Sequence, residues 1–184
     1  MKRYSASTSV QMEGPDISTC KTLVKSEVES HEIKVVISVD NRYKLTVDGK
    51  TIPVDPNYNL WTINTHKFTV TGNGPWVVAV EGTDEGVVAG FIGTVYVDNI
   101  LKAETGTLVS PVKFKTFLKP SDRWDRSISF DDSRWFRPAA CSSRLWDGWV
   151  ENFKAETKSN AGPIWHLSCR NTDITAKFRA IVSA

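Results

Sequence analysis

Apolar and polar residues alternate along many short stretches of the chain. In residues 32–39, apolar side chains occupy every second position, from 33 to 39, which is the period of a half-buried β-strand. Residues 176–182 alternate in the same way. Runs of this kind recur at the spacing of an all-β sandwich. The predicted strands are residues 7–13, 21–28, 32–39, 43–48, 67–72, 76–82, 86–97, 111–117, 127–130, 163–168 and 175–182.

Turn signals and the scarcity of helical periodicity complete the pattern. Asp48-Gly49 follows a strand-like run and supplies the positive φ angles that a tight hairpin turn needs. Only residues 149–157 indicate a helix, of one or two turns. The sequence therefore predicts one all-β domain with little helix at residues 13–184, preceded by a polar N-terminal arm at residues 1–12.

One predicted loop is long. Residues 137–163 exceed the usual length of a connection within a compact domain. Binding residues concentrate on loops that a rigid scaffold positions, so this segment is where we look first for function.

Length and charge limit the function classes. The chain has 184 residues, of which 40% are hydrophobic and 24% charged, with a formal net charge of +2. This size suits a single domain. Because the chain has neither a basic block nor an arginine-aromatic stripe, we expect no nucleic-acid partner and no anionic membrane partner. No run of about 18 apolar residues occurs, so we expect no membrane insertion.

The N-terminus gives a mixed signal about export. Residues 1–9 begin like a signal peptide but do not reach an apolar core region. Either the protein has no leader, or the leader is absent from this sequence.

Three cysteines cannot all pair within one chain, and none lies in a zinc-type spacing. A Cys141–Cys169 disulfide would join the long loop to a late strand, and Cys20 would then be free or link two chains. Such a bridge requires an oxidising compartment. The alternative is that all three are reduced, buried thiols.

Three segments in a fixed order carry a family resemblance. They are residues 40–50 (DNRYKLTVDGK), 76–93 (WVVAVEGTDEGVVAGFIG) and 130–135 (FDDSRW). Together they resemble the galactose-binding-like β-sandwich, a jelly roll that occurs on many glycosidases and secreted proteins. The resemblance covers about residues 32–182 and implies an extracellular jelly-roll domain. It implies little about the ligand, since one fold hosts many functions.

Acidic residues offer two candidate sites. Asp131-Asp132-Ser133 lies in the most specific motif, and we interpret it as a structural corner because Asp and Ser cap turns through their own backbone. Many jelly rolls of this family hold a structural calcium ion, which needs several oxygen ligands. Candidate ligands in one turn are Glu81, Asp84 and Glu85. A solvated turn is the simpler alternative.

No catalytic pattern stands out. The three histidines are isolated in sequence, and neither a nucleophile elbow nor a phosphate-binding glycine loop is present. We expect a protein that is not an enzyme.

The first functional hypothesis is an extracellular carbohydrate-binding module with a glycan ligand. Sugars need an aromatic face for their C–H surface and planar polar groups for their hydroxyls. Two clusters among the seven tryptophans fit this need. The candidate ligand-binding residues are Arg144, Trp146, Asp147 and Trp149 in one cluster, and Arg123, Trp124 and Arg126 in the other. The alternative for both is an arginine stacked on tryptophan to close a loop over the core.

The second hypothesis is a structural matrix or coat protein that forms homo-oligomers. Its basis is the odd cysteine, the polar arm and the near-neutral charge, which resists association less than a high charge would. An arm that adds a strand to a neighbour's sheet edge would be the simplest mechanism.

Overall fold

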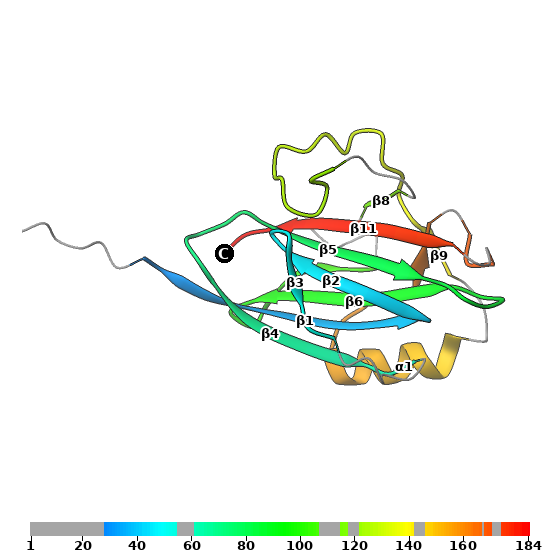
Figure 1. Ribbon diagram of the computed structural model, residues 1–184. Coiled ribbons are helices and arrows are strands. Elements are labelled where there is room, and N and C mark those ends of the chain that lie inside the picture. The colour runs from blue at the N-terminus through cyan, green and yellow to red at the C-terminus, as the bar shows by residue number, and fades with distance from the viewer. Residues whose placement is uncertain are drawn as a thin grey trace, which may run out of the picture.

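The computed structural model describes residues 28–54, 61–106, 115–117, 122–141, 146–166, 168–170 and 174–184. In these ranges the chain forms two antiparallel β-sheets packed face to face, with one α-helix against the outside of one sheet (Figure 1). The predicted all-β sandwich with little helix is confirmed. The predicted N-terminal arm and the strand predicted at residues 7–13 lie outside the described ranges.

Sheet A has the strand order β4-β1-β6-β10-β9, and β7 also pairs with β6. Sheet B has the order β3-β2-β5-β11-β8. The strands of sheet A are β1 (Ser30–Asp40), β4 (Asn64–Thr71), β6 (Gly90–Val97), β7 (Ile100–Glu104), β9 (Ala139–Ala140) and β10 (Ile164–Trp165). Those of sheet B are β2 (Arg42–Val47), β3 (Lys50–Ile52), β5 (Trp76–Thr83), β8 (Lys115–Phe117) and β11 (Thr175–Val182).

The alternation seen in the sequence places the core between the sheets. Ile33 and Ile37 of β1 point inward and are fully buried. Phe178 of β11 lies 5.0 Å from Phe91 and 5.5 Å from Trp165, measured between ring centroids, so aromatic side chains join the two sheets. Each such side chain contributes roughly 1.5–3 kcal/mol through burial.

Two tight turns organise the hairpins. The predicted turn joins β2 to β3, with φ of 46° at Asp48 and 74° at Gly49. The Asp48 carboxylate also accepts a hydrogen bond from the backbone N–H of Val77 at 2.8 Å. A second turn, which the sequence analysis missed, joins β6 to β7 through Asp98 and Asn99, with φ of 51° and 65°.

Helix α1 (Asp147–Thr157) confirms the helix predicted at residues 149–157 and begins two residues earlier. The strand predicted at residues 127–130 is wrong. This stretch forms turns, because the backbone N–H groups of Ser127 and Phe130 donate to Arg123 and Ser127, respectively, instead of to a neighbouring strand. Of the helices in the described part, none has the length and apolar character needed to cross a bilayer.

The disulfide expected between Cys141 and Cys169 is present, with an S–S distance of 2.01 Å. It joins the end of β9 to the segment before β11, across 28 positions in sequence. Closing a loop of this length stabilises a fold by about 3–4 kcal/mol in the chain-entropy account. Cys20 lies outside the described residues.

Candidate functional site

Helix α1 lies on the outer face of sheet A and is held there by aromatic side chains. Trp146, Trp149 and Phe153 are buried, and they pack against Val36 and Ile92, which point outward from the sheet. These apolar contacts fix one side of the helix and leave the opposite side in solvent.

Two hydrogen bonds fix the position of the helix along the sheet. The indole N–H of Trp149 donates to Oγ of Ser38 in β1 at 2.9 Å. The hydroxyl of Tyr96 in β6 donates to the carbonyl of Thr157, at the end of the helix, at 2.7 Å. The helix is therefore anchored near both ends.

Trp61, just before β4, completes a group of three tryptophans. Its ring centroid lies 4.8 Å from that of Trp146 and 5.0 Å from that of Trp149, and its ring is nearly perpendicular to the Trp149 ring. Trp146 is 2% exposed and Trp149 is 7% exposed, whereas Trp61 is only partly buried. Trp61 is thus the member of the group with the most surface available to a ligand.

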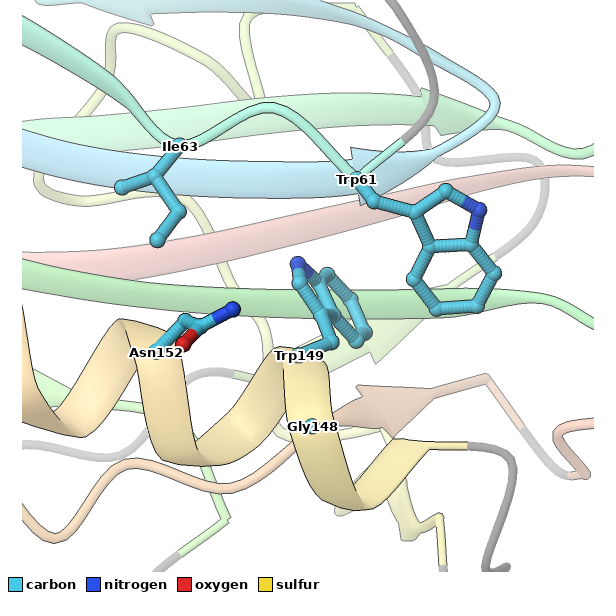
Figure 2. Close-up of a pocket in the computed structure, with 5 residues that line it drawn as sticks. All are labelled: Trp61, Ile63, Gly148, Trp149 and Asn152. Carbon is cyan, nitrogen blue, oxygen red and sulfur yellow. The ribbon is translucent and has the colours of Figure 1, made fainter.

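A cavity of about 330 Å³ opens between Trp61 and the first turns of α1. Figure 2 shows Trp149 and the Asn152 amide facing it from the helix, and Trp61 and Ile63 from the segment leading into β4. We call it the tryptophan pocket, and its lining residues are Trp61, Ile63, Gly148, Trp149 and Asn152. It combines aromatic walls with one planar polar group.

Gly148 makes the pocket open on the helix side. A Cβ atom built on this residue meets no atom within 4 Å, so the space above it is empty. The first side-chain atom at this position would therefore lie in open space beside the pocket.

The first predicted cluster is only partly assembled here. Trp149 lines the tryptophan pocket, while Trp146 lies beneath it in the core and offers almost no surface. Asp147 is exposed in the first helical turn, where a carboxylate interacts favourably with the helix dipole. Arg144 lies outside the described residues.

The second predicted cluster lies against sheet B. Trp124 lines a cavity of only about 50 Å³ with Lys44, Thr46, Glu81 and Asp125. A cavity of this volume is too small for a sugar ring and has room only for water molecules.

The arginines of that cluster have structural surroundings. Arg126 forms an ion pair with Asp125 at 2.9 Å and lies against Gly49, where an added Cβ would come within 2.8 Å of the Cβ of Arg126. Arg123 is exposed in a turn, with φ of 69°. These contacts attach a loop to the β2–β3 turn through an ion pair and backbone packing, and the arginine–tryptophan stacking of the alternative stays a prediction.

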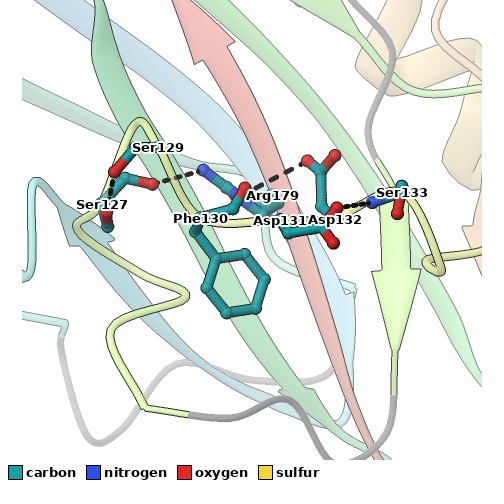
Figure 3. Close-up of polar contacts among 7 residues, drawn as sticks. All are labelled: Ser127, Ser129, Phe130, Asp131, Asp132, Ser133 and Arg179. Atoms are coloured by element: carbon teal, nitrogen blue, oxygen red, sulfur yellow. Dashed lines mark hydrogen bonds and ion pairs between the residues drawn. The ribbon is translucent and has the colours of Figure 1, made fainter.

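The Phe-Asp-Asp-Ser motif forms a corner around a buried arginine. Arg179 of β11 is 1% exposed and donates to the backbone carbonyls of Ser127 and Phe130, at 2.9 and 3.4 Å (Figure 3). It also forms an ion pair with Asp132 at 3.4 Å, and Asp131 accepts a hydrogen bond from the backbone of Ser133. These contacts are those of the structural corner predicted for this motif.

The candidate calcium ligands face different partners. Glu81 forms an ion pair with Lys177 at 3.2 Å, and Glu85 forms one with Arg42 at 3.0 Å. Asp84 is buried. Among the residues with described positions, no group of three or more His, Cys, Asp or Glu is placed to hold a metal.

Asp84 has an acidic neighbour that the sequence analysis did not consider. Burial, together with the charge of Asp84, raises the pKa of Asp40 to about 6. Calcium binding at this end of the sandwich stays a prediction.

Sequence reasoning missed four of the five pocket residues, namely Trp61, Ile63, Gly148 and Asn152. Trp61 is far from the helix in sequence, and Gly148 and Asn152 carry no distinctive signal on their own. The available clue was the spacing within the helix predicted at residues 149–157, where Trp149 and Asn152 are three positions apart and therefore neighbours on the helix surface.

The chain was compared with protein-family models, curated proteins and solved structures, and no match was found. The resemblance to the galactose-binding-like family therefore depends on the sequence motifs alone.

Proposed function

We propose that this protein is a non-catalytic carbohydrate-binding module that holds a glycan in the tryptophan pocket. The observation that carries the proposal is the cavity of about 330 Å³ between Trp61 and helix α1. Sugar-binding sites combine an aromatic surface for the C–H face of the ring with planar polar groups for its hydroxyls. Trp61 and Trp149 supply the first of these, and the Asn152 amide supplies the second.

The site is suited to binding because its walls are already in place. Trp149 is held by its hydrogen bond to Ser38, and Trp61 is packed against both helix tryptophans. A site whose side chains are ordered before binding loses less conformational entropy when the ligand arrives.

The disulfide supports the proposed extracellular location. Structural disulfides form and persist in oxidising compartments, which include the secretory pathway and the cell exterior. The Cys141–Cys169 bridge is what a secreted module of this kind would carry.

The test is a glycan-array screen of the purified protein, followed by titration of the best ligand against two Gly148 variants. Gly148→Gln places a long side chain in the empty space of the pocket and should weaken binding at least about tenfold, a change of roughly 1.4 kcal/mol. Gly148→Ala adds only a methyl group at the same position and should keep most of the affinity. Equal affinity of both variants for the ligand would refute the pocket as the site.

Two tryptophan substitutions, one in the tryptophan pocket and one in the second predicted cluster, show which region binds the glycan. Trp61→Ala should abolish binding by removing the aromatic wall, while Trp124→Ala should leave it unchanged, because Trp124 faces a cavity too small for a sugar. The reverse result would move the site to sheet B. No binding by the unmodified protein to any glycan would refute the function itself.

Calcium is proposed as a structural ion and is tested separately. Thermal unfolding with added calcium or with a chelator should show a higher midpoint in calcium, because an ion that binds only the folded state stabilises it. An unchanged midpoint would remove calcium from the proposal and leave the glycan site intact.

A further inference from the structure

Strand β4 (Asn64–Thr71) is the outer strand of sheet A. Its pairing with β1 runs unbroken from Ser30 opposite Thr71 to Ile37 opposite Asn64, and no described strand lies on its other side. An edge strand presents a row of backbone N–H and C=O groups that can pair with another chain. β4 is long and regular enough to do so.

The usual protection against edge pairing is sparse on β4. Proteins block exposed edges with charged side chains, above all lysine, and with proline, bulges or inward-pointing charges. β4 contains no proline and no interruption of its register, and its one lysine, Lys67, lies on the outer face in an ion pair with Glu32 at 3.2 Å. Within the part of the chain that the structure describes, nothing pairs with this edge of the strand.

A groove of about 300 Å³ lies beside this edge, and we call it the lateral groove. It opens between β4 and β3, where β3 has only three residues. Phe68 and Val70 of β4 line it together with Ile52, and all three are half-buried. A second strand at the edge of β4 would cover this apolar surface.

We propose that β4 pairs antiparallel with β4 of a second copy of this chain, so that two copies of sheet A form one continuous sheet. Residues directly opposite each other in such a pair lie on the same face of the sheet. The twofold axis that relates the two copies must therefore pass through a residue position, so that this residue lies opposite the same residue of the second copy. An axis between two residues would place side chains of opposite faces against each other. This restriction leaves few registers to consider.

Charge excludes one of these registers, and an aromatic pair favours another. An axis at Lys67 would place two lysines directly opposite each other, and like charges in that position are destabilising. An axis at Phe68 instead places Lys67 opposite Thr69 of the second copy, and Thr65 opposite Thr71. It also sets the two Phe68 side chains against each other over the joined lateral grooves, and aromatic cross-strand pairs are stabilising.

The partner is a second copy because this strand is complementary to itself. In the register centred on Phe68, Val70 faces His66, and on the outer face each lysine faces a threonine. The net charge of only +2 offers little repulsion between copies. The pairing is short, so we expect a weak dimer, with a dissociation constant on the order of 10–100 µM.

Sedimentation equilibrium of the full chain over a range of concentrations tests the dimer, and charge variants at Thr69 test the interface. Thr69→Lys places two lysine pairs across the axis and should weaken the dimer by about two- to thirtyfold, while Thr69→Glu should strengthen it by a similar factor. Thr65→Lys is the matched control, because it adds the same charge opposite a neutral threonine. A monomer at every concentration, or a dimer that responds equally to all three variants, would overturn the proposal.

Cysteine cross-linking tests the register independently. In a Cys20→Ser background, Phe68→Cys places two thiols directly opposite each other, about 4.5–5.5 Å apart between Cα atoms, within reach of a disulfide. Val70→Cys faces a histidine in this register and should not cross-link. Cross-linking through position 70 and not 68 would refute the register, and cross-linking through neither would refute the interface. The inference does not rest on the proposed glycan site.

Discussion

The outer faces of both sheets are covered, but in different ways. Helix α1 covers sheet A, and residues 122–138, which we call the covering segment, cover sheet B. Both regions carry tryptophans beside acidic residues, and sequence composition treats them as equivalent candidates. Among the residues with described positions, the cavity beside α1 measures about 330 Å³, against about 50 Å³ for the cavity beside Trp124 of the covering segment.

The difference comes from how each region satisfies its backbone. A helix pairs its own N–H and C=O groups, so only its apolar side needs contact with the sheet, and the space beside Gly148 stays open. The covering segment is irregular, so its carbonyls need partners from elsewhere. Arg179 donates to two of them and holds the segment close to the sheet. The type of backbone, more than the type of side chain, decides where a pocket can form.

The largest expected effect comes from removing the arginine beneath the covering segment. Arg179→Met leaves two backbone carbonyls and the Asp132 carboxylate without this donor, and we expect a loss of about 3–5 kcal/mol in the free energy of unfolding. Urea denaturation measures the loss. Lys177→Met is the matched control on the same strand. Its ion pair with Glu81 is partly exposed, so it should cost at most about 1 kcal/mol.

If the two methionine variants lose the same stability, Arg179 does not have the anchoring role given to it here. If Arg179→Met stays folded, its glycan binding should be unchanged, because the tryptophan pocket lies on the opposite sheet.

The next effect concerns the anchor of α1. Ser38→Ala removes the acceptor for the buried indole N–H of Trp149, and leaving a buried donor without a partner costs about 1–3 kcal/mol. Because Trp149 also lines the pocket, glycan affinity should fall along with stability. Ser38→Thr keeps the hydroxyl and serves as the control. An Ala variant with full stability and full affinity would show that the bond does not position the indole.

The fold was predictable from the sequence to a large extent, for a physical reason. Strands with one buried face show a period of two, as in the residues from Ile33 to Val39, and the Asp48-Gly49 turn requires residues that tolerate positive φ. The short strand β3 and the Asp98-Asn99 turn were missed, because three residues show no period and Asn99 is a weaker turn signal than glycine.

The candidate site was predictable only in part. Trp149 was identified because aromatic residues cluster near it in the sequence, but its exposure depends on the tertiary structure. Trp61 reaches the pocket from a segment about 90 positions away, a proximity that no local pattern carries. The covering segment also carries tryptophans beside charged residues, and only the structure shows that the buried Arg179 of β11 holds it against the sheet.

A smaller effect follows from the open side of the helix. Gly148→Ala should raise the free energy of unfolding by about 0.5–1 kcal/mol, because alanine loses less backbone entropy than glycine on entering a helix and its methyl group meets no atom within 4 Å. Urea denaturation measures the gain. A loss of stability would show that the space beside this residue is not empty.

The smallest expected effect is a pH dependence of local stability that should appear in the covering segment and not in α1. His166 is buried next to the covering segment, with Nδ1 3.3 Å from Oγ1 of Thr116 and its ring 5.9 Å from that of Phe136. Burial lowers the pKa of His166 below its ordinary value of 6.5. The stability that the neutral His166 contributes is therefore fully present above pH 6.5. It is lost as the pH falls toward the folded-state pKa, because the unfolded chain takes up the proton first.

Hydrogen exchange shows where this loss of stability is felt. The amide of Phe136, which donates to the carbonyl of Thr116, should lose protection as the pH falls below 6.5, after correction for the intrinsic rate. The amides of α1 should not, since the helix is held by contacts that do not involve His166. His166→Gln should remove the pH dependence at Phe136. Equal loss of protection in both regions would show that the protein opens as a single unit, and that the two covers differ in structure but not in local stability.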